Sequence, residues 1–347
     1  MLYIVVAYLW ASICLYILLG GADFGAGIVE LASRAKHRRS VRNIMYNAIG
    51  PIWEANHMWL IIAIVILFAG FPEIYSTMSV YMHIPLVLML LGIMARGTAF
   101  AFRHYDAVTD GMQRLYSRIF TLSSLVTPFF LGIIAAATVS RTIDPQAGDF
   151  LSAYVFSWLN PFGISVGFFT VAICGYLAAV FAIGQTAEQE HRRTLVRLAR
   201  VFIGIAIGCG ALVFVAAHRS GIPLIAWIVG DTWGQLAILL ATVSLFAQFV
   251  ALKRANVVWM RLLAGFQVVM ILFAATYRHF PDLVLLKDGT ALSLTDHHGG
   301  LASIDALGWA LVLGSIFILP ALFYLMYAFR EAPPSNPVKD ATTNQDQ

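Results

Sequence analysis

Long apolar stretches alternate with short polar segments along the whole chain. Nine of these stretches are about 20 residues long, which is the length that a helix needs to cross the hydrocarbon core of a bilayer. They lie near residues 3–22, 53–74, 79–102, 117–139, 162–184, 201–218, 232–252, 260–278 and 307–329. This pattern predicts an all-α polytopic membrane protein with nine transmembrane helices.

The polar segments alternate in charge. Every odd-numbered segment carries arginine or lysine, as in residues 34–42 and 192–200, whereas the even-numbered ones are poor in cations and contain acids such as Asp144 and Asp282. Cation-rich loops stay on the cytoplasmic side of a membrane. The pattern therefore predicts a multi-pass membrane protein with its N-terminus outside and its C-terminus inside.

The composition agrees with this interpretation. With 60% hydrophobic and 12% charged residues, the chain has too much apolar surface for a soluble fold of its size. Its net charge of +4 lies in the loops predicted to face the cytoplasm, which suits contact with anionic membrane lipid and not with nucleic acid. The three cysteines lie inside predicted spans without a CxxC motif, so neither a disulfide nor a metal-thiolate site is expected.

A few ionisable side chains fall within or beside the apolar spans. Asp23 lies in a glycine-rich run at the end of the first span, Glu54 and His57 lie one turn apart in the second, and Arg96 and Arg103 lie two turns apart in the third. All are expected in the cytoplasmic half of the membrane. Because an unpartnered charge at that depth costs several kcal/mol, each is a functional candidate.

The role of these residues is left open by the sequence. Asp23 either neutralises Arg96, which we expect to lie close to it, or handles protons. Glu54 is favoured as a proton carrier because it lies one turn inside an apolar span beside His57. The glycine-rich run follows a membrane helix and not a strand, so it predicts close helix packing and not dinucleotide binding.

Two other classes of function compete with a proton-handling role. His57 and His83 suggest haem ligation, but no span carries a second histidine at a helical spacing and no CxxCH is present, so we expect no haem and no metal on this chain. A secondary transporter for a small cation or metabolite is the alternative. Against it, Pro51, Pro72 and Pro161 stand at span ends and no inverted repeat is evident.

Four segments together resemble the signature stretches of subunit II of the cytochrome bd-type quinol oxidases, and their order and spacing match as well. They are Gly21–Gly27, Pro51–Ile61, Phe71–Tyr75 and Arg96–Arg103. The second segment, with Trp53, Asn56 and Trp59 around Glu54 and His57, is more similar to the cyanide-insensitive branch of the family.

The resemblance implies a fold of two four-helix bundles and a peripheral ninth helix. The first bundle is expected within residues 1–140, the second within 155–280 and the ninth helix at 305–330. The polar, proline-containing residues 331–347 are expected to form a disordered cytoplasmic tail.

The resemblance also implies the partners and the chemistry. Subunit I would hold the haems, of b and d type or of b type alone, oxidise quinol and reduce oxygen to water. This chain would be its haem-free partner in the membrane lipid. Whether a quinone or lipid binds here, and whether small single-helix accessory subunits join, is left open.

Site residues follow from the matched segments. Glu54, Asp23 and His57 are the candidates for a cytoplasmic proton pathway, and Arg96, Arg103, Trp53, Asn56 and Trp59 are the candidates for charge pairing or structural support.

Overall fold

Nine helices that are long and apolar enough to cross a membrane are present in the computed structural model, which describes residues 1–50, 53–105, 110–186, 188–254 and 256–328. This confirms the all-α polytopic prediction. The spans are α1 with α2 (Leu2–Ala32), α4 (Trp53–Gly70), α6 (His83–Tyr105), α7 (Asp110–Val139), α9 (Pro161–Ala182), α10 (Gln189–Arg219), α12 (Thr232–Arg254), α13 (Val257–Thr276) and α14 (Leu301–Ala328).

The first span is longer than residues 3–22. Helix α1 (Leu2–Leu15), a π-helical segment (Tyr16–Gly20) and α2 (Gly21–Ala32) follow one another without a break. The glycine-rich run is helical because its glycines allow close packing. A Cβ on Gly25 would overlap the backbone of Cys174 in α9, and one on Gly27 would overlap the side chain of Ser124 in α7. Asp23 and Glu30 therefore lie inside a packed helix.

The polar segments contain more structure than the hydropathy pattern predicts. The first holds an amphipathic helix, α3 (Ala35–Ile49), which buries Val41, Ile44 and Met45 on one face. The predicted span at 53–74 ends at Gly70 instead, and a separate helix starts at Pro72, whose ring suits a first helical turn. The shorter helices are α5 (Pro72–Tyr81), α8 (Phe150–Tyr154), a 3₁₀ turn (Ile183–Gln185) and α11 (Leu224–Val229).

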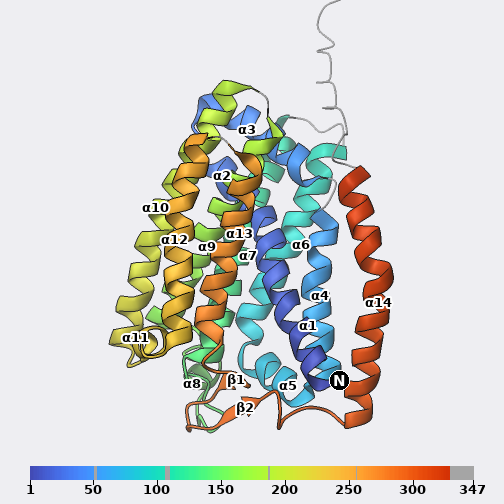
Figure 1. Ribbon diagram of the computed structural model, residues 1–347, viewed down its shortest axis with the longest axis vertical. Coiled ribbons are helices and arrows are strands. Elements are labelled where there is room, and N and C mark those ends of the chain that lie inside the picture. The colour runs from blue at the N-terminus through green and yellow to red at the C-terminus, as the bar shows by residue number, and fades with distance from the viewer. Residues whose placement is uncertain (51–52, 106–109, 187, 255, 329–347) are drawn as a thin grey trace, which may run out of the picture.

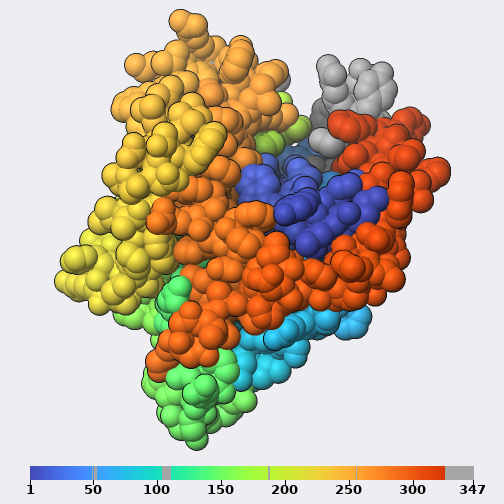
Figure 2. Space-filling model, turned by 60° about the horizontal axis from the view of Figure 1, so that its bottom comes forward, coloured from blue at the N-terminus to red at the C-terminus, as the bar shows by residue number. Residues whose placement is uncertain are grey.

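A small cap covers the end of the molecule where α13 leads into α14. Strands β1 (Asp282–Leu285) and β2 (Ala291–Ser293) pair antiparallel, and Ile143 bridges Leu286 beside them. Lys287 Nζ donates to Asp144 Oδ2 at 2.9 Å. Figure 2 shows these orange residues spread across this face, between the blue N-terminal residues and the green segment near residue 150. The sequence pattern did not predict this hairpin.

Helix α9 occupies a central position in the structure (Figure 1). It packs against α2, α7 and α10, while α6 packs on α7 and α12 packs on α13. The close contacts of α2 and α7 with α9 cross the boundary between the two predicted bundles, so the division into residues 1–140 and 155–280 stays a prediction. Residues 331–347, the predicted tail, lie outside the described residues.

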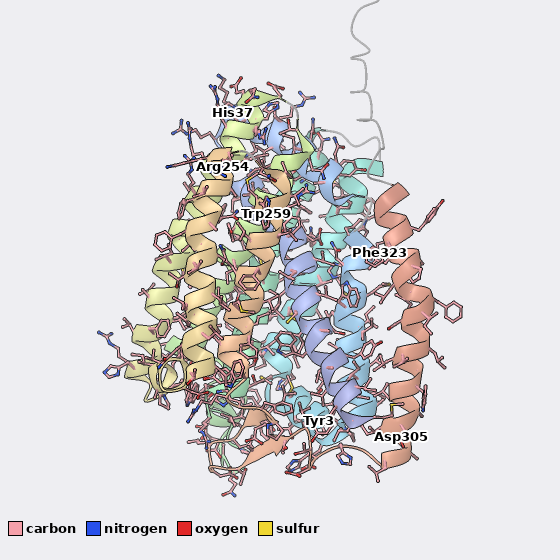
Figure 3. The ribbon with its side chains drawn as sticks, in the orientation of Figure 1. Tyr3, His37, Arg254, Trp259, Asp305 and Phe323 are labelled. Carbon is pink, nitrogen blue, oxygen red and sulfur yellow. The ribbon has the colours of Figure 1, made fainter. Side chains whose placement is uncertain are left out.

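Helix α14 lies at the edge of the molecule, against α1 and α4 (Figure 1). Only 6% of its apolar window is buried, which agrees with a peripheral ninth helix. Figure 3 shows Phe323 pointing away from the other helices. The figure also places His37 and Arg254 at one end and Tyr3 and Asp305 at the other. We call the end with α3, His37 and Arg254 the basic end.

Candidate functional site

Two buried ion pairs join α2 to α6 in the half of the molecule nearer the basic end. Arg96 donates from Nη1 to Oδ2 of Asp23 at 2.6 Å and from Nη2 to Oδ1 at 2.7 Å. Arg103 donates from both Nη1 and Nη2 to Oε2 of Glu30, each at 3.1 Å. Both the acids and the arginines are seven residues apart, which is two helical turns. We call these four residues the ion-pair ladder.

The Asp23–Arg96 pair is the more completely satisfied of the two. Each residue is only 1% exposed. The guanidinium also donates to the backbone oxygen of Asp23 at 2.8 Å and to Ser124 Oγ at 3.2 Å. The rings of Phe24 and Phe120 lie 5.3 and 5.0 Å from Arg96 Cζ. The predicted approach of Asp23 and Arg96 is thus observed, and loss of either partner would leave an uncompensated buried charge.

The second ion pair involves two residues, Glu30 and Arg42, that were not predicted from the sequence as site residues. Glu30 is 1% exposed, and its Oε1 accepts a hydrogen bond from Arg42 Nε at 2.8 Å. Arg103 also lies over the Phe120 ring, with Cζ 4.7 Å from the centroid. One carboxylate therefore faces two guanidinium groups. The matching seven-residue spacings of the acids and the arginines carried this signal in the sequence.

His57 reaches the ladder from α4. Its Nε2 lies 3.8 Å from Asp23 Oδ2, and its ring is surrounded by those of Tyr16, Phe24 and Trp53, at centroid distances of 6.2, 5.8 and 6.4 Å. This is an electrostatic contact beyond hydrogen-bond length. Among the described residues, His57 Nδ1 has no hydrogen-bond partner.

Two other buried polar atoms lie beside the same group of rings. Tyr16 Oη and Trp59 Nε1, like His57 Nδ1, have no hydrogen-bond partner within the described part of the protein. Tyr16, Phe24 and Trp59 pack together in one core cluster. Buried polar atoms of this kind are ordinarily hydrogen-bonded to protein or water. Each of the three is therefore available to bind water within this group of rings.

Glu54 is separated from this buried cluster, contrary to the expectation of an acid enclosed beside His57. It lies in the first turn of α4, and its side chain is exposed, without a hydrogen-bond or ion-pair partner in the described ranges. The helix places Asn56 and Trp59 on its buried face instead. Glu54 and His57 are one turn apart on α4, yet Glu54 stays at the surface while His57 contacts Asp23.

The surface that carries Glu54 is otherwise apolar. Along α4, the exposed side chains on the same stripe are Ile61, Val65 and Phe68, which are 59%, 47% and 63% exposed. Helix α6 presents a second exposed stripe, which contains Val87, Leu90, Leu91, Met94 and Phe102. We call these two stripes, together with Glu54, the α4–α6 face.

The two histidines considered for haem ligation lie far apart. His57 contacts Asp23, which is bound to Arg96, whereas His83 begins α6 thirteen residues before Arg96, a rise of roughly 20 Å along the helix. His83 Nδ1 instead lies 2.8 Å from the backbone oxygen of Val80. In the described part of the chain, no three His, Cys, Asp or Glu residues come together as a metal site.

Comparison with known proteins gives one consistent result. The family model for cytochrome bd terminal oxidase subunit II matches residues 1–329. Cytochrome bd ubiquinol oxidase subunit 2 of Bacillus subtilis is 26% identical over 334 residues, covering 95% of each chain. Cytochrome bd-I ubiquinol oxidase subunit 2 of Escherichia coli K12 is 28% identical over 217 residues, covering 60% of this chain and 56% of the relative.

A solved structure shares the fold. A chain of the bd oxidase from Geobacillus thermodenitrificans superposes with a TM-score of 0.74, covering 94% of this chain and 98% of that one, at 21% sequence identity. The same arrangement of membrane helices is therefore present in both.

Proposed function

This chain belongs to the cytochrome bd terminal oxidase subunit II family, and we propose that within the oxidase it helps to deliver protons to the site of oxygen reduction. The complex is a quinol:oxygen oxidoreductase, and its haems are held by the partner, subunit I. Reducing oxygen to water consumes protons, so a path must lead them into the membrane. Family membership sets aside the secondary transporter interpretation.

The observation that supports this proposal is the contact of His57 with Asp23, together with the place of Glu54 at the surface one turn before His57 on α4. Glu54 offers a titratable carboxylate on the molecular surface, and His57 lies one turn along α4, with Nε2 3.8 Å from Asp23. His57 Nδ1 and Tyr16 Oη are buried polar atoms that can bind water between them. The Glu54→Gln exchange in the assembled oxidase, followed as quinol-dependent oxygen consumption, tests whether the carboxylate carries protons.

We further propose that subunit I covers the α4–α6 face. A carboxylate on a stripe of Ile61, Val65 and Phe68 would be poorly accommodated against lipid tails. A protein surface with a polar group opposite Glu54 would solvate it and bury the apolar stripes. Glu54 would then lie at the junction of the two subunits, where protons must pass from one to the other.

Photo-crosslinking tests this interface. Replacing Phe68 with p-benzoylphenylalanine in the intact complex is expected to give a crosslink to subunit I, visible as a band of the summed mass on a denaturing gel. Phe246 on α12 is the matched control, because it is 69% exposed against 63% for Phe68 yet lies on another helix. Crosslinking to subunit I from Phe246 and not from Phe68 would place the interface on α12 and contradict this proposal.

We propose that the basic end faces the cytoplasm of the bacterial cell. Reporter fusions after residues near 110 and 195 are then expected to score as cytoplasmic, and fusions near 147 and 290 as external, because cation-rich loops resist translocation. A cytoplasmic signal at 290 would rule out this orientation. The C-terminal residues 329–347 lie outside the described part of the chain, and their cytoplasmic location rests on the same charge rule.

The chain is expected to be free of haem when it is made alone. Its two candidate ligands lie at opposite ends of the spans, so no axial pair can form on one haem. Membranes that contain this subunit without subunit I should show no Soret absorption above that of membranes lacking both. A stoichiometric Soret band that disappears in His57→Ala would overturn this division of roles.

The remaining expectations concern the complex as a whole. We propose that the haems of subunit I are of b and d type or of b type alone. The Trp53 to Trp59 segment supports the proposal that this chain belongs to the cyanide-insensitive branch. Quinol is the electron donor named for several relatives.

A further inference from the structure

A cavity lined by arginines opens at the basic end, outside the proposed proton path. Its volume is about 250 Å³, and it lies between α2, α3 and α7. Arg38 and Arg42 reach it from α3, and Arg114 and Arg118 reach it from α7. The acidic side chain that lines it is Glu30, and Ser117 contributes a hydroxyl group.

The positive charge of this cavity is not neutralised by the described residues. The carboxylate of Glu30 is already bound by Arg42 and by Arg103 behind it. Arg114 and Arg118 lie one turn apart on α7, and neither has an ion-pair or hydrogen-bond partner among the residues that the structure describes. Like charges at this spacing repel each other. An anion placed between them would relieve that repulsion.

The cavity also contains an unsatisfied buried donor. Ser117 lies between the two arginines in the sequence, and its Oγ is buried without a hydrogen-bond partner in the described ranges. A hydroxyl group and guanidinium groups that converge on one space are the donors that phosphate oxygens accept from, and arginine can bind phosphate through two parallel hydrogen bonds. The ligand chemistry that fits is therefore a phosphate-bearing anion.

The depth of the cavity indicates where this phosphate comes from. The span Gly111–Val139 has 29 residues, or about 43 Å, whereas the hydrocarbon core is about 30 Å thick. Arg141 follows its far end, so the excess length lies at the end with Arg114 and Arg118, in the headgroup layer. Leu31, which is 47% exposed, lines the same cavity and offers an apolar contact for an acyl chain.

We propose that this cavity binds the headgroup phosphate of an anionic phospholipid from the leaflet at the basic end. The site is independent of the proton path, since neither Glu54 nor His57 lines it. The lipid would bridge α3 and α7 by drawing together arginines that otherwise repel. A free phosphate ion offers the same oxygens but no acyl chain, and the two sources can be separated by experiment.

The test measures lipid binding to the purified, haem-loaded oxidase complex. Phosphatidylglycerol, phosphatidylcholine and inorganic phosphate are each titrated at constant ionic strength, and bound lipid is counted by native mass spectrometry. In the Arg114→Gln/Arg118→Gln variant the apparent Kd for phosphatidylglycerol should rise about thirtyfold, because each arginine contributes roughly a factor of five to the affinity. Phosphatidylcholine should bind this site weakly in every protein.

A matched control is available on α10. Arg193 and Arg197 are also one turn apart in the first turns of a basic-end helix but line no part of this cavity. Arg193→Gln/Arg197→Gln should change the phosphatidylglycerol Kd by less than twofold. An equal loss in both double variants would show general surface attraction and overturn the site. If the α7 double variant does not assemble, Arg118→Gln is compared with Arg197→Gln in the same way.

The source of the phosphate is decided by competition. For a lipid site, inorganic phosphate at the same ionic strength as a chloride control should not displace phosphatidylglycerol. Displacement by phosphate alone, lost in the Arg114→Gln/Arg118→Gln variant, would identify a site for soluble phosphate and overturn the lipid assignment. Neither outcome depends on turnover, so failure here is distinguishable from failure of the proton-delivery proposal.

Discussion

Replacing Glu54 with glutamine is expected to give an assembled, haem-loaded oxidase whose turnover with quinol falls roughly a hundredfold. Glutamine keeps the length and hydrogen-bonding capacity of the side chain but cannot take up and release a proton, and a positioned proton-transfer group typically contributes a factor of about 10² or more. The rate of oxygen consumption per haem measures this turnover. It is determined on purified complex whose absorption spectrum shows that the haems are present.

Two further variants separate proton transfer from packing. Glu54→Asp keeps the carboxylate and should retain much more turnover than Glu54→Gln. Glu73, an exposed glutamate on α5 at the end opposite the basic end, provides the same chemical change at a distant place, and Glu73→Gln should leave turnover within twofold. Full turnover in an assembled Glu54→Gln complex would leave Glu54 with a structural role alone.

Replacing either Asp23 or Arg96 alone is expected to impair assembly more than replacing both residues together. Arg96→Met leaves the Asp23 carboxylate, 1% exposed, without its guanidinium, and Asp23→Asn leaves the guanidinium without its counter-charge. Each single change should cost about 3 to 5 kcal/mol. The double variant should lose less stability than either single variant, because it leaves neither charge unpaired. Thermal loss of the haem-loaded complex in detergent, together with assembled yield, measures these differences.

The exposed pair of Asp144 and Lys287 is the control for this cycle. Their side chains are 22% and 60% exposed, and the hydrogen bond from Lys287 holds the pKa of Asp144 below its usual range. An ion pair in contact with water contributes little to stability. Asp144→Asn should therefore change stability far less than Asp23→Asn. If the Asp23 and Arg96 effects simply add, the two charges act independently despite their contact.

The sequence by itself determined the class, the number of spans and the family of this protein. These follow from the solvent, because a helix that crosses lipid must be about 20 apolar residues long wherever it packs, and the interruptions between such runs are visible in the chain. The Asp23–Arg96 contact was also predictable, since a lone charge at that depth is too costly to leave unpaired. Glu30 follows Asp23 by seven residues, and Arg103 follows Arg96 by seven, so the sequence also indicated the second ion pair.

The tertiary structure alone decided which residues share an environment. Glu54 and His57 are three residues apart in one motif, yet the first is exposed on the α4–α6 face and the second contacts Asp23. The glycine-rich run continues the first span as α2 because α7 and α9 approach it closely at Gly25 and Gly27. The arginine-lined cavity likewise needs α3 and α7 side by side. Hydropathy records how deep a residue lies in the membrane, whereas the direction of its side chain depends on which helices pack beside it.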